Sequence, residues 1–348
     1  MNIINKLITG DKYRKNVESI SLRNLLLRLP QRKTDSNLKK IPTFPLALHV
    51  EITNRCDNKC VFCARHKMNR PLQHMEEKIF YKIMDECAKY MPNVIYLFKD
   101  GDPILHPELC KYITYAKKVK AAKNITISTS ANALTPELSQ KIIESGLDEI
   151  FFSVDSLTED KYKILKGTDK YSTVLSNIFS FIKIKEKMKS RTPNVTVKIL
   201  ATDLVMDDIA LFERMWKNIA DTVLIDRELS IWDGTNKQVI DFIGTMKNYN
   251  FIKPVKRFPC NRPWYMSCIY VDGKMGVCPE DWDQKTIVGD VTRDTIYDIW
   301  HDDKLNQFKC KHIDGEWESL PACYNCGAWM TKNMGNWFVA NRERALSR

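Results

Sequence analysis

The sequence of 348 residues predicts an α/β fold, a partial (β/α)6 barrel followed by a small cysteine-rich domain. Between residues 46 and 230, six apolar, strand-like segments alternate with segments of helical periodicity. Strands that alternate with helices pair in parallel through right-handed crossovers. From Phe258 onward the chain is rich in Cys, Trp, Pro and Gly and has few long periodic segments. A short, loop-rich domain of this kind usually needs a metal to hold it together.

The expected elements follow one another regularly. The predicted strands are 47–53, 94–98, 125–128, 149–154, 195–200 and 222–225, and the predicted helices are 75–90, 106–121, 135–146, 158–166, 172–189 and 207–220. Pro107 suits a first helical turn, and Thr135 suits an N-cap. Active sites in such barrels form at the carboxyl ends of the strands, so polar residues just after each strand are the candidates.

Changes in composition predict the domain boundaries. Residues 1–45 are a basic, polar N-terminal extension, 46–230 the barrel, 231–258 a bridging segment, 259–330 the cysteine-rich domain and 331–348 a tail. No run of eighteen apolar residues occurs, so we expect no membrane span. The first residues do not form a convincing signal peptide. Eleven cysteines without an export signal therefore favour metal or redox use in a reducing, cytoplasmic setting.

The formal net charge of +11 indicates which binding partners are favoured and says little about the fold. It fits a small-molecule substrate that is anionic or sugar-like, and it also fits an acidic electron donor protein. No nucleic-acid-binding module is apparent, and the scattered lysines are more typical of a solvated surface.

The strongest single signal is the C-x3-C-x2-C cluster of Cys56, Cys60 and Cys63 directly after the first strand. Iron–sulfur clusters are normally held by four cysteine thiolates, so a local set of three indicates an iron with an open coordination position. A zinc site with His66 as the fourth ligand, or inert buried cysteines, are the alternatives.

This trio, with the aromatic Phe62 before its last cysteine, resembles the radical S-adenosylmethionine (SAM) superfamily. The resemblance implies a [4Fe–4S] cluster whose open iron binds SAM. It also implies that one electron cleaves SAM to a 5′-deoxyadenosyl radical, which takes a hydrogen atom from the substrate. The cofactor carries this chemistry, while the protein positions and shields it.

Short polar motifs at successive strand ends resemble the family's SAM-binding segments. Lys99-Asp-Gly-Asp-Pro103 resembles the Gly-Gly-Glu-Pro motif, with Asp102 in place of the glutamate and Asp100 in place of the first glycine. Similar polar segments follow the third and fourth strands, although such residues are also common turn formers. The resemblance implies these cofactor-binding residues: Phe62, Gly101, Asp102, Pro103, Ser128, Ser130, Ser153 and Asp155.

The C-terminal cysteines resemble the SPASM/twitch domains that hold auxiliary clusters. The chain has no cysteine after Cys326, which favours a single auxiliary [4Fe–4S] cluster of the twitch type, similar to that of aminocyclitol dehydrogenase-type members. Cys268 and Cys310 lie near the set and could replace one of its members, and a four-cysteine zinc site is the alternative. Cys87 and Cys110 fall in helical segments and are expected to be core residues. The implied ligands are Cys260, Cys278, Cys323 and Cys326.

Together these features predict a radical SAM oxidoreductase. We expect it to oxidise an alcohol carbon of a sugar- or cyclitol-like molecule, with the auxiliary cluster accepting the electron and a flavodoxin- or ferredoxin-type donor supplying the first one. Arg227 and Glu228, after the sixth strand, are the candidate catalytic pair, and a solvent-exposed loop pair is the alternative. Other functions that fit are a peptide or protein maturase of the RiPP or sulfatase type, a sugar dehydratase or epimerase, and a zinc-stapled binding protein.

Overall fold

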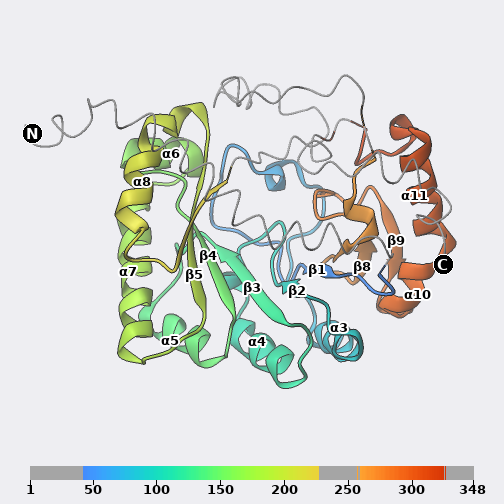
Figure 1. Ribbon diagram of the computed structural model, residues 1–348, viewed down its shortest axis with the longest axis horizontal. Helices are drawn as coiled ribbons and strands as arrows, with labels where there is room; N and C mark the ends of the chain where they lie inside the picture. The colour runs from blue at the N-terminus through green and yellow to red at the C-terminus, as the bar shows by residue number, and fades with distance from the viewer. Residues whose placement is uncertain (1–41, 227–256, 258, 325, 327–348) are drawn as a thin grey trace, which may run out of the picture. The chain divides into compact units, whose positions relative to one another are not determined.

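Six parallel strands in chain order form the main part of the computed structural model (Figure 1). The structure describes residues 42–226, 257, 259–324 and 326. The predictions for residues 1–41, for Arg227 and Glu228 after the sixth strand, for most of the bridging segment 231–258 and for the tail therefore lie outside the described residues. The parallel strands are β1 (Ala47–Val50), β2 (Val94–Tyr96), β3 (Asn124–Thr129), β4 (Glu149–Ser153), β5 (Asn194–Leu200) and β6 (Thr222–Asp226).

Each of these strands pairs with the next in parallel, so the order β6-β5-β4-β3-β2-β1 runs along the sheet. Leu48 lies opposite Ile95, and Ile95 lies opposite Ile125. All three are fully buried, as expected for strands of a parallel sheet. The other edge of β1 pairs with a strand of the C-terminal domain, so the sheet stays open. The partial barrel predicted from the alternation is therefore confirmed.

Amphipathic helices join the strands. They are α3 (Glu77–Tyr90), α4 (Leu109–Lys118), α5 (Pro136–Glu144), α6 (Glu159–Lys166), α7 (Tyr171–Lys187) and α8 (Ile209–Trp216). Helix α3 buries Ile79, Ile83 and Met84, the face that its periodicity predicted. Thr135 caps α5 by accepting a hydrogen bond from Leu138 N, which confirms its predicted role.

Several element boundaries were predicted wrongly, among them the end of β1 and the start of the helix after β2. Strand β1 ends at Val50 rather than at residue 53, because Thr53 forms an isolated antiparallel bridge with His74 instead of continuing the ladder. The helix after β2 begins at Leu109 rather than at His106. A separate turn, η3 (Pro103–Leu105), comes first, and His106 Nδ1 then accepts the Glu108 N–H ahead of the helix. Pro107 therefore precedes the helix.

The C-terminal domain has more regular structure than its composition predicted. It contains β7 (Met266–Ile269), β8 (Lys274–Gly276), β9 (Ile287–Asp290), α10 (Ile296–His301) and α11 (Asp303–Asp314). Strand β7 lies parallel to β1, while β8 and β9 follow in antiparallel order, so the domain extends the core sheet to nine strands. Strands of three or four residues are too short to produce a readable period. Within the described ranges, no helix is long and apolar enough to cross a bilayer.

Candidate functional site

The loop after β1 carries the first three cysteines and is tied to the end of α6. Lys59 N bonds to Lys166 O at 3.0 Å, and Val61 N bonds to Leu165 O at 3.0 Å. Gly167 makes this approach possible, because its left-handed φ of 65° turns the chain and a Cβ there would lie 2.7 Å from Lys59 O. These two backbone hydrogen bonds therefore fix the cysteine loop against the end of α6.

Burial opposes ionisation of the three thiols. Desolvation raises the pKa of Cys56 to about 12 and the pKa values of Cys60 and Cys63 to about 11. A thiolate is the form that binds metal, and a positively charged iron centre would offset this cost. The nearby cations of the protein are too few to ionise the three thiols without a metal. Three soft donors of this kind on one short loop fit an iron–sulfur cluster.

The loop after β2 packs directly on the cysteine loop. A Cβ on Gly101 would lie 2.4 Å from Thr53 O and 2.7 Å from Arg55 O, so only glycine fits. Asp102 N donates to Arg55 O at 2.9 Å, and the Asp102 carboxylate caps the turn that begins at Pro103 by accepting from Ile104 N. The two predicted motifs are thus brought together by backbone contact.

Asp102 also connects β2 to the end of β3. Its buried Oδ2 accepts from Thr129 Oγ1 at 3.0 Å, from Ser130 N at 2.9 Å and from Ser130 Oγ at 2.8 Å. Burial raises the pKa of Asp102, although these hydrogen bonds favour its ionised form. Farther along the strand ends, the hydroxyls of Ser128 and Ser153 lie 3.4 Å apart.

Asp155 forms a buried ion pair that the sequence did not predict. Its carboxylate accepts from Lys166 Nζ at 2.5 Å and from Leu200 N at 2.7 Å, and its φ of 59° is left-handed. Burial opposes the charge, but Lys166 and Lys198 outweigh it and lower the pKa of Asp155. Lys166 Nζ also lies 5.7 Å from the centre of the Phe62 ring.

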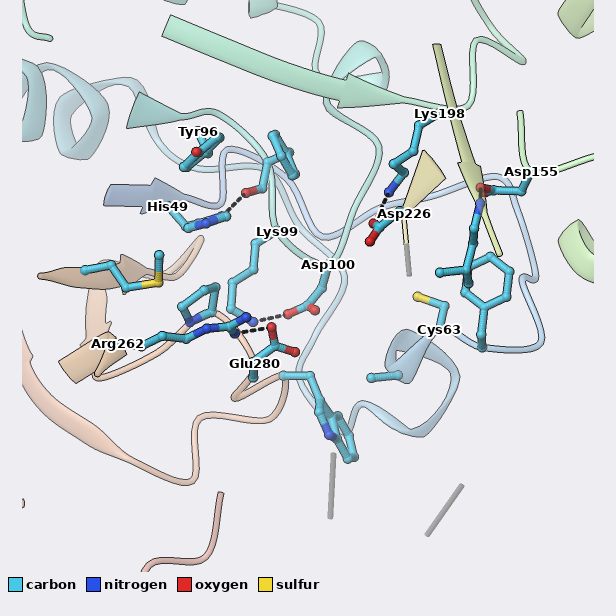
Figure 2. Close-up of a pocket in the computed structure, with 17 residues that line it drawn as sticks. His49, Cys63, Tyr96, Lys99, Asp100, Asp155, Lys198, Asp226, Arg262 and Glu280 are labelled. Atoms are coloured by element: carbon cyan, nitrogen blue, oxygen red, sulfur yellow. Dashed lines mark hydrogen bonds and ion pairs between the residues drawn. The ribbon is translucent and has the colours of Figure 1, made fainter. Parts of the chain in front are cut away.

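A cavity of about 560 Å³ opens between the carboxyl ends of the strands and the C-terminal domain (Figure 2). Among the predicted site residues, Phe62, Cys63 and Asp155 line it. The rest do not line it: Cys56, Cys60, Gly101, Asp102, Pro103, Ser128, Ser130 and Ser153. Three of the predicted residues therefore lie on the cavity wall, and the sequence analysis singled out few of the other wall residues.

Charged side chains that were not among the predicted site residues form much of the cavity wall. Figure 2 shows Lys99 beside Asp100, Arg262 beside Glu280, and Lys198 beside Asp226. The Lys99–Asp100 pair is 2.5 Å apart, and the Lys198–Asp226 pair is 3.6 Å apart. The only signal in the sequence was their position just after strands or near a cysteine. Apolar wall residues include Tyr96, Phe98, Met266 and Trp282.

A buried network continues from Asp100 into the C-terminal domain. Arg70 forms two hydrogen bonds with Glu51, at 2.7 and 2.8 Å, and one with Asp100 at 3.0 Å. Glu51 also accepts from Val271 N at 3.1 Å, and Arg70 Nε donates to Trp282 O at 3.1 Å. Arg70 therefore connects the cysteine loop, the loop after β2 and the C-terminal domain.

The four predicted C-terminal cysteines surround one small enclosed space of about 20 Å³. Cys268 and Cys310 do not line it. Cys268 is fully buried and its thiol donates to Cys278 O at 3.3 Å. Within the described residues, no three cysteine, histidine or carboxylate side chains are close enough together to hold a single metal ion. The residues that share the space are Cys260, Cys278, Cys323 and Cys326.

The other two cysteines differ in burial. Cys87 is fully buried in α3, as expected of a core residue. Cys110 in α4 is only half-buried.

Cationic and histidine side chains surround this second cysteine set. His312 in α11 lies with Nε2 3.3 Å from Cys323 Sγ, and Arg262 Nη1 lies 4.0 Å from Cys278 Sγ. Arg257 donates to Cys323 O at 2.6 Å and to Tyr324 O at 2.9 Å. Burial lowers the pKa of His312 to about 3, so its ring is neutral. Soft thiol donors next to positive charge fit an iron–sulfur cluster.

Two protein-family models match this architecture. The model of the radical SAM superfamily matches residues 50–195, and that of the SPASM iron–sulfur cluster-binding domain matches residues 260–327. The chain contains a radical SAM domain followed by a SPASM domain. A radical SAM domain binds a [4Fe–4S] cluster and SAM, and a SPASM domain indicates an auxiliary iron–sulfur cluster.

Curated relatives share only part of their length with this chain. A tungsten-containing aldehyde ferredoxin oxidoreductase cofactor-modifying protein of Pyrococcus furiosus is 26% identical over 198 residues, which are 56% of this chain and 54% of that protein. A GTP 3′,8-cyclase of Clostridium botulinum is 29% identical over 126 residues, or 35% of this chain and 39% of the cyclase. The matched region thus spans about half or less of each relative.

Solved structures match over more of the chain. BtrN, in complex with AdoMet and 2-DOIA, has a TM-score of 0.53 at 17% identity and covers 81% of this chain and 92% of its own. Streptococcus suis SuiB, bound to its precursor peptide SuiA, has a TM-score of 0.53 at 14% identity over 90% of this chain and 75% of its own. The enzyme anSMEcpe, with bound AdoMet, has a TM-score of 0.55 at 13% identity over 87% and 98%. At these identities the likeness establishes the fold alone.

Proposed function

We propose that this chain is a radical SAM oxidoreductase that oxidises an alcohol carbon of a sugar- or cyclitol-like molecule and passes one electron to its auxiliary cluster. The observation that carries the proposal is the position of Glu280, which lines both the 560 Å³ cavity and the small space among the C-terminal cysteines. A substrate in the cavity would therefore lie one side chain away from an electron acceptor.

The residues fall into two cofactor-holding groups. Cys56, Cys60 and Cys63 would hold the first cluster, with SAM bound on the side of Phe62, the Gly101–Pro103 loop and Asp155. Cys260, Cys278, Cys323 and Cys326 would hold the auxiliary cluster. When bound, the first cluster and SAM supply the radical that removes a hydrogen atom, and the protein supplies position and shielding.

The charges of the cavity wall favour a neutral, hydroxylated substrate over a phosphorylated one. Within the described residues, each lysine or arginine that lines the cavity is paired with a carboxylate: Lys99 with Asp100, Lys198 with Asp226, and Arg262 with Glu280. A paired cation attracts a phosphate weakly, whereas adjacent donors and acceptors match hydroxyl groups, which both donate and accept. Of the two substrate types that fit the net charge, we therefore favour the sugar-like one.

Peptide modification is the second candidate. SuiB, a structure of similar TM-score, was solved with a precursor peptide, and its alignment covers 90% of this chain. Either substrate would require an external electron donor, for which a flavodoxin or ferredoxin is the proposed class.

Isotope transfer separates these candidates. The reconstituted, oxygen-free protein should contain about eight irons per chain if both clusters are complete. Polyols carrying deuterium on the alcohol carbon, cyclitols and aminocyclitols among them, should transfer deuterium to 5′-deoxyadenosine and yield one ketone per SAM consumed. Recovery of a rearranged or dehydrated product at the same oxidation level would indicate an epimerase or dehydratase instead. Deuterium transfer from labelled peptides and from none of the polyols would support the peptide function and overturn the proposal.

A further inference from the structure

His312 is placed to donate a hydrogen bond to one of the proposed auxiliary-cluster cysteines. The residue is 1% exposed and lies on α11, on the wall of the space that the four cysteines surround. Its two ring nitrogens face two different partners from the cysteine segments. Nδ1 lies 3.3 Å from Cys260 N, and Nε2 lies 3.3 Å from Cys323 Sγ.

These contacts determine the position of the ring proton. The backbone N–H of Cys260 can only donate, so Nδ1 must be the accepting nitrogen and carries no proton. A neutral imidazole then carries its proton on Nε2, where the neighbouring atom is the Cys323 sulfur. Both ring nitrogens are thereby satisfied, which is the expected state of a buried polar side chain.

We propose that His312 is a positioning residue that donates its Nε2–H to the Cys323 thiolate and raises the reduction potential of the auxiliary cluster. The inference rests on the proposed function, because it assumes that Cys323 is a cluster ligand. Hydrogen bonds to the coordinating sulfurs are among the main determinants of a cluster's potential. A donor draws electron density from the sulfur and stabilises the more negative, reduced cluster. The site is enclosed, so water screens this effect little.

Two arginines also lie near the cysteines, but Arg262 is paired with Glu280, and Glu280 and Asp281 line the same space, so the donor to sulfur that the test isolates is His312. Arg262 Nη1 lies 4.0 Å from Cys278 Sγ, and Arg257 donates to the carbonyl of Cys323. The aromatic ring of Phe308 lines the same space, with its centre 5.1 Å from that of His312, and offers no N–H donor. Phe308 is therefore the matched control position.

The test is a redox titration of the full chain carrying Cys56→Ala, Cys60→Ala and Cys63→Ala, so that only the auxiliary cluster contributes to the electron paramagnetic resonance signal. Adding His312→Phe should make reduction about tenfold less favourable, a shift of about 59 mV to more negative potential. Phe308→Leu should leave the potential unchanged. An unchanged potential in the His312→Phe protein, with iron retained, would overturn the inference and leave the proposed function intact. Absence of iron from the triple-alanine protein would overturn the ligand assignment itself.

A second measurement does not depend on how well the His312 variant folds. The chain contains six histidines, and of these His312 lines the space. With ¹⁵N-labelled histidine and the auxiliary cluster reduced, pulsed resonance should detect a weak nitrogen coupling, transmitted through the N–H···S contact. A coupling as strong as that of a directly bound imidazole would make His312 a ligand and overturn the inference. Absence of any coupling would also overturn it.

Discussion

The two cysteine sites differ in how the chain builds them and in what surrounds them. The first uses three cysteines of one loop, between a barrel strand and a cavity of about 560 Å³. The second uses four cysteines from separate segments around a space of about 20 Å³. Asp102 lies close to Cys56 and Lys166 close to Cys60 in the first site, whereas Arg257 and His312 share the wall of the second space with Glu280 and Asp281.

This difference matches two different tasks. A site that opens onto a large cavity and has one ligand too few can bind a small molecule at the metal. A closed site among four cysteines would be suited to accept and hold an electron. Under the proposed function, the first site would serve hydrogen abstraction and the second would serve electron acceptance.

The largest expected effect comes from removing one site at a time. Cys56→Ala, Cys60→Ala and Cys63→Ala together should abolish reductive cleavage of SAM and leave about four irons per chain. Cys323→Ala with Cys326→Ala should also lower the iron content to about four, but cleavage of SAM in the absence of substrate should persist. Iron analysis and assay of 5′-deoxyadenosine check both results. Loss of SAM cleavage only in the second variant would reverse the assignment of the two sites.

The next largest effect is a loss of folding stability when Arg70, which connects the cysteine loop to the C-terminal domain, is replaced. Its side chain is 8% exposed and is paired with the fully buried Glu51. Arg70→Met should reduce the free energy of unfolding by about 3–5 kcal/mol, because it leaves Glu51 buried and without its partner cation. Lys78→Met removes one member of an exposed pair with Glu76 and should cost at most about 1 kcal/mol. Anaerobic denaturant titrations measure both, and equal losses in the two variants would mean that the network contributes no special stability.

The sequence signal for the first site is local, whereas the surroundings of the second site could not be read from the sequence, for a physical reason. Cys56, Cys60 and Cys63 are close in sequence and follow a strand, so local spacing alone reports the chemistry. The contacts around the second site join residues that are far apart in the chain. Cys260 N and His312 are 52 residues apart, and Arg257 and Cys323 are 66 apart. No local pattern contains such pairs.

The same reasoning explains which parts of the fold were predictable. Six apolar segments with intervening helices gave the parallel sheet, because the amphipathic helices between them are long enough to show their own period. The parallel pairing of β7 with β1 was missed because it depends on the partner strand rather than on Met266–Ile269 itself. The Arg70 network was missed for a similar reason, as a lone arginine in a loop carries no sign of the carboxylates it will meet.

The stability of the folded chain should depend on pH through the buried His106. His106 is 4% exposed, and its ring lies 5.0 Å from that of His74 and 4.6 Å from that of Tyr112. Burial, reinforced by His74, lowers the pKa of His106 from 6.5 to about 4. Between these values the unfolded chain binds a proton that the folded chain does not, so stability falls as the pH decreases from about 6.5 to about 4.

The contribution of His106 can be isolated with His106→Asn, which keeps an acceptor for the Glu108 N–H. The stability advantage of the unaltered chain over this variant should shrink by up to about 3 kcal/mol over that range. Denaturant titrations of both proteins at several pH values give the difference, in which contributions from the clusters cancel. A difference that stays constant with pH would show that His106 ionises normally in the folded chain.

The smallest predicted effect tests whether the cavity site depends on close packing of its two loops. Gly101→Ala would place a methyl group 2.4 Å from Thr53 O and 2.7 Å from Arg55 O, so the loop after β2 must move away from the cysteine loop. Overpacking of this kind typically costs about 1–3 kcal/mol. Because the movement separates the proposed SAM-binding segment from Cys56–Cys63, SAM affinity should fall by roughly five- to 150-fold. Gly315→Ala is the control, since Gly315, unlike Gly101, has a positive φ and has only side-chain neighbours at 3.7 Å or more, far from the cavity residues in sequence. That control should lose stability through backbone strain and keep its SAM affinity, as measured by calorimetry. Equal affinity in the Gly101→Ala protein and the unaltered chain would mean that SAM does not depend on this loop contact.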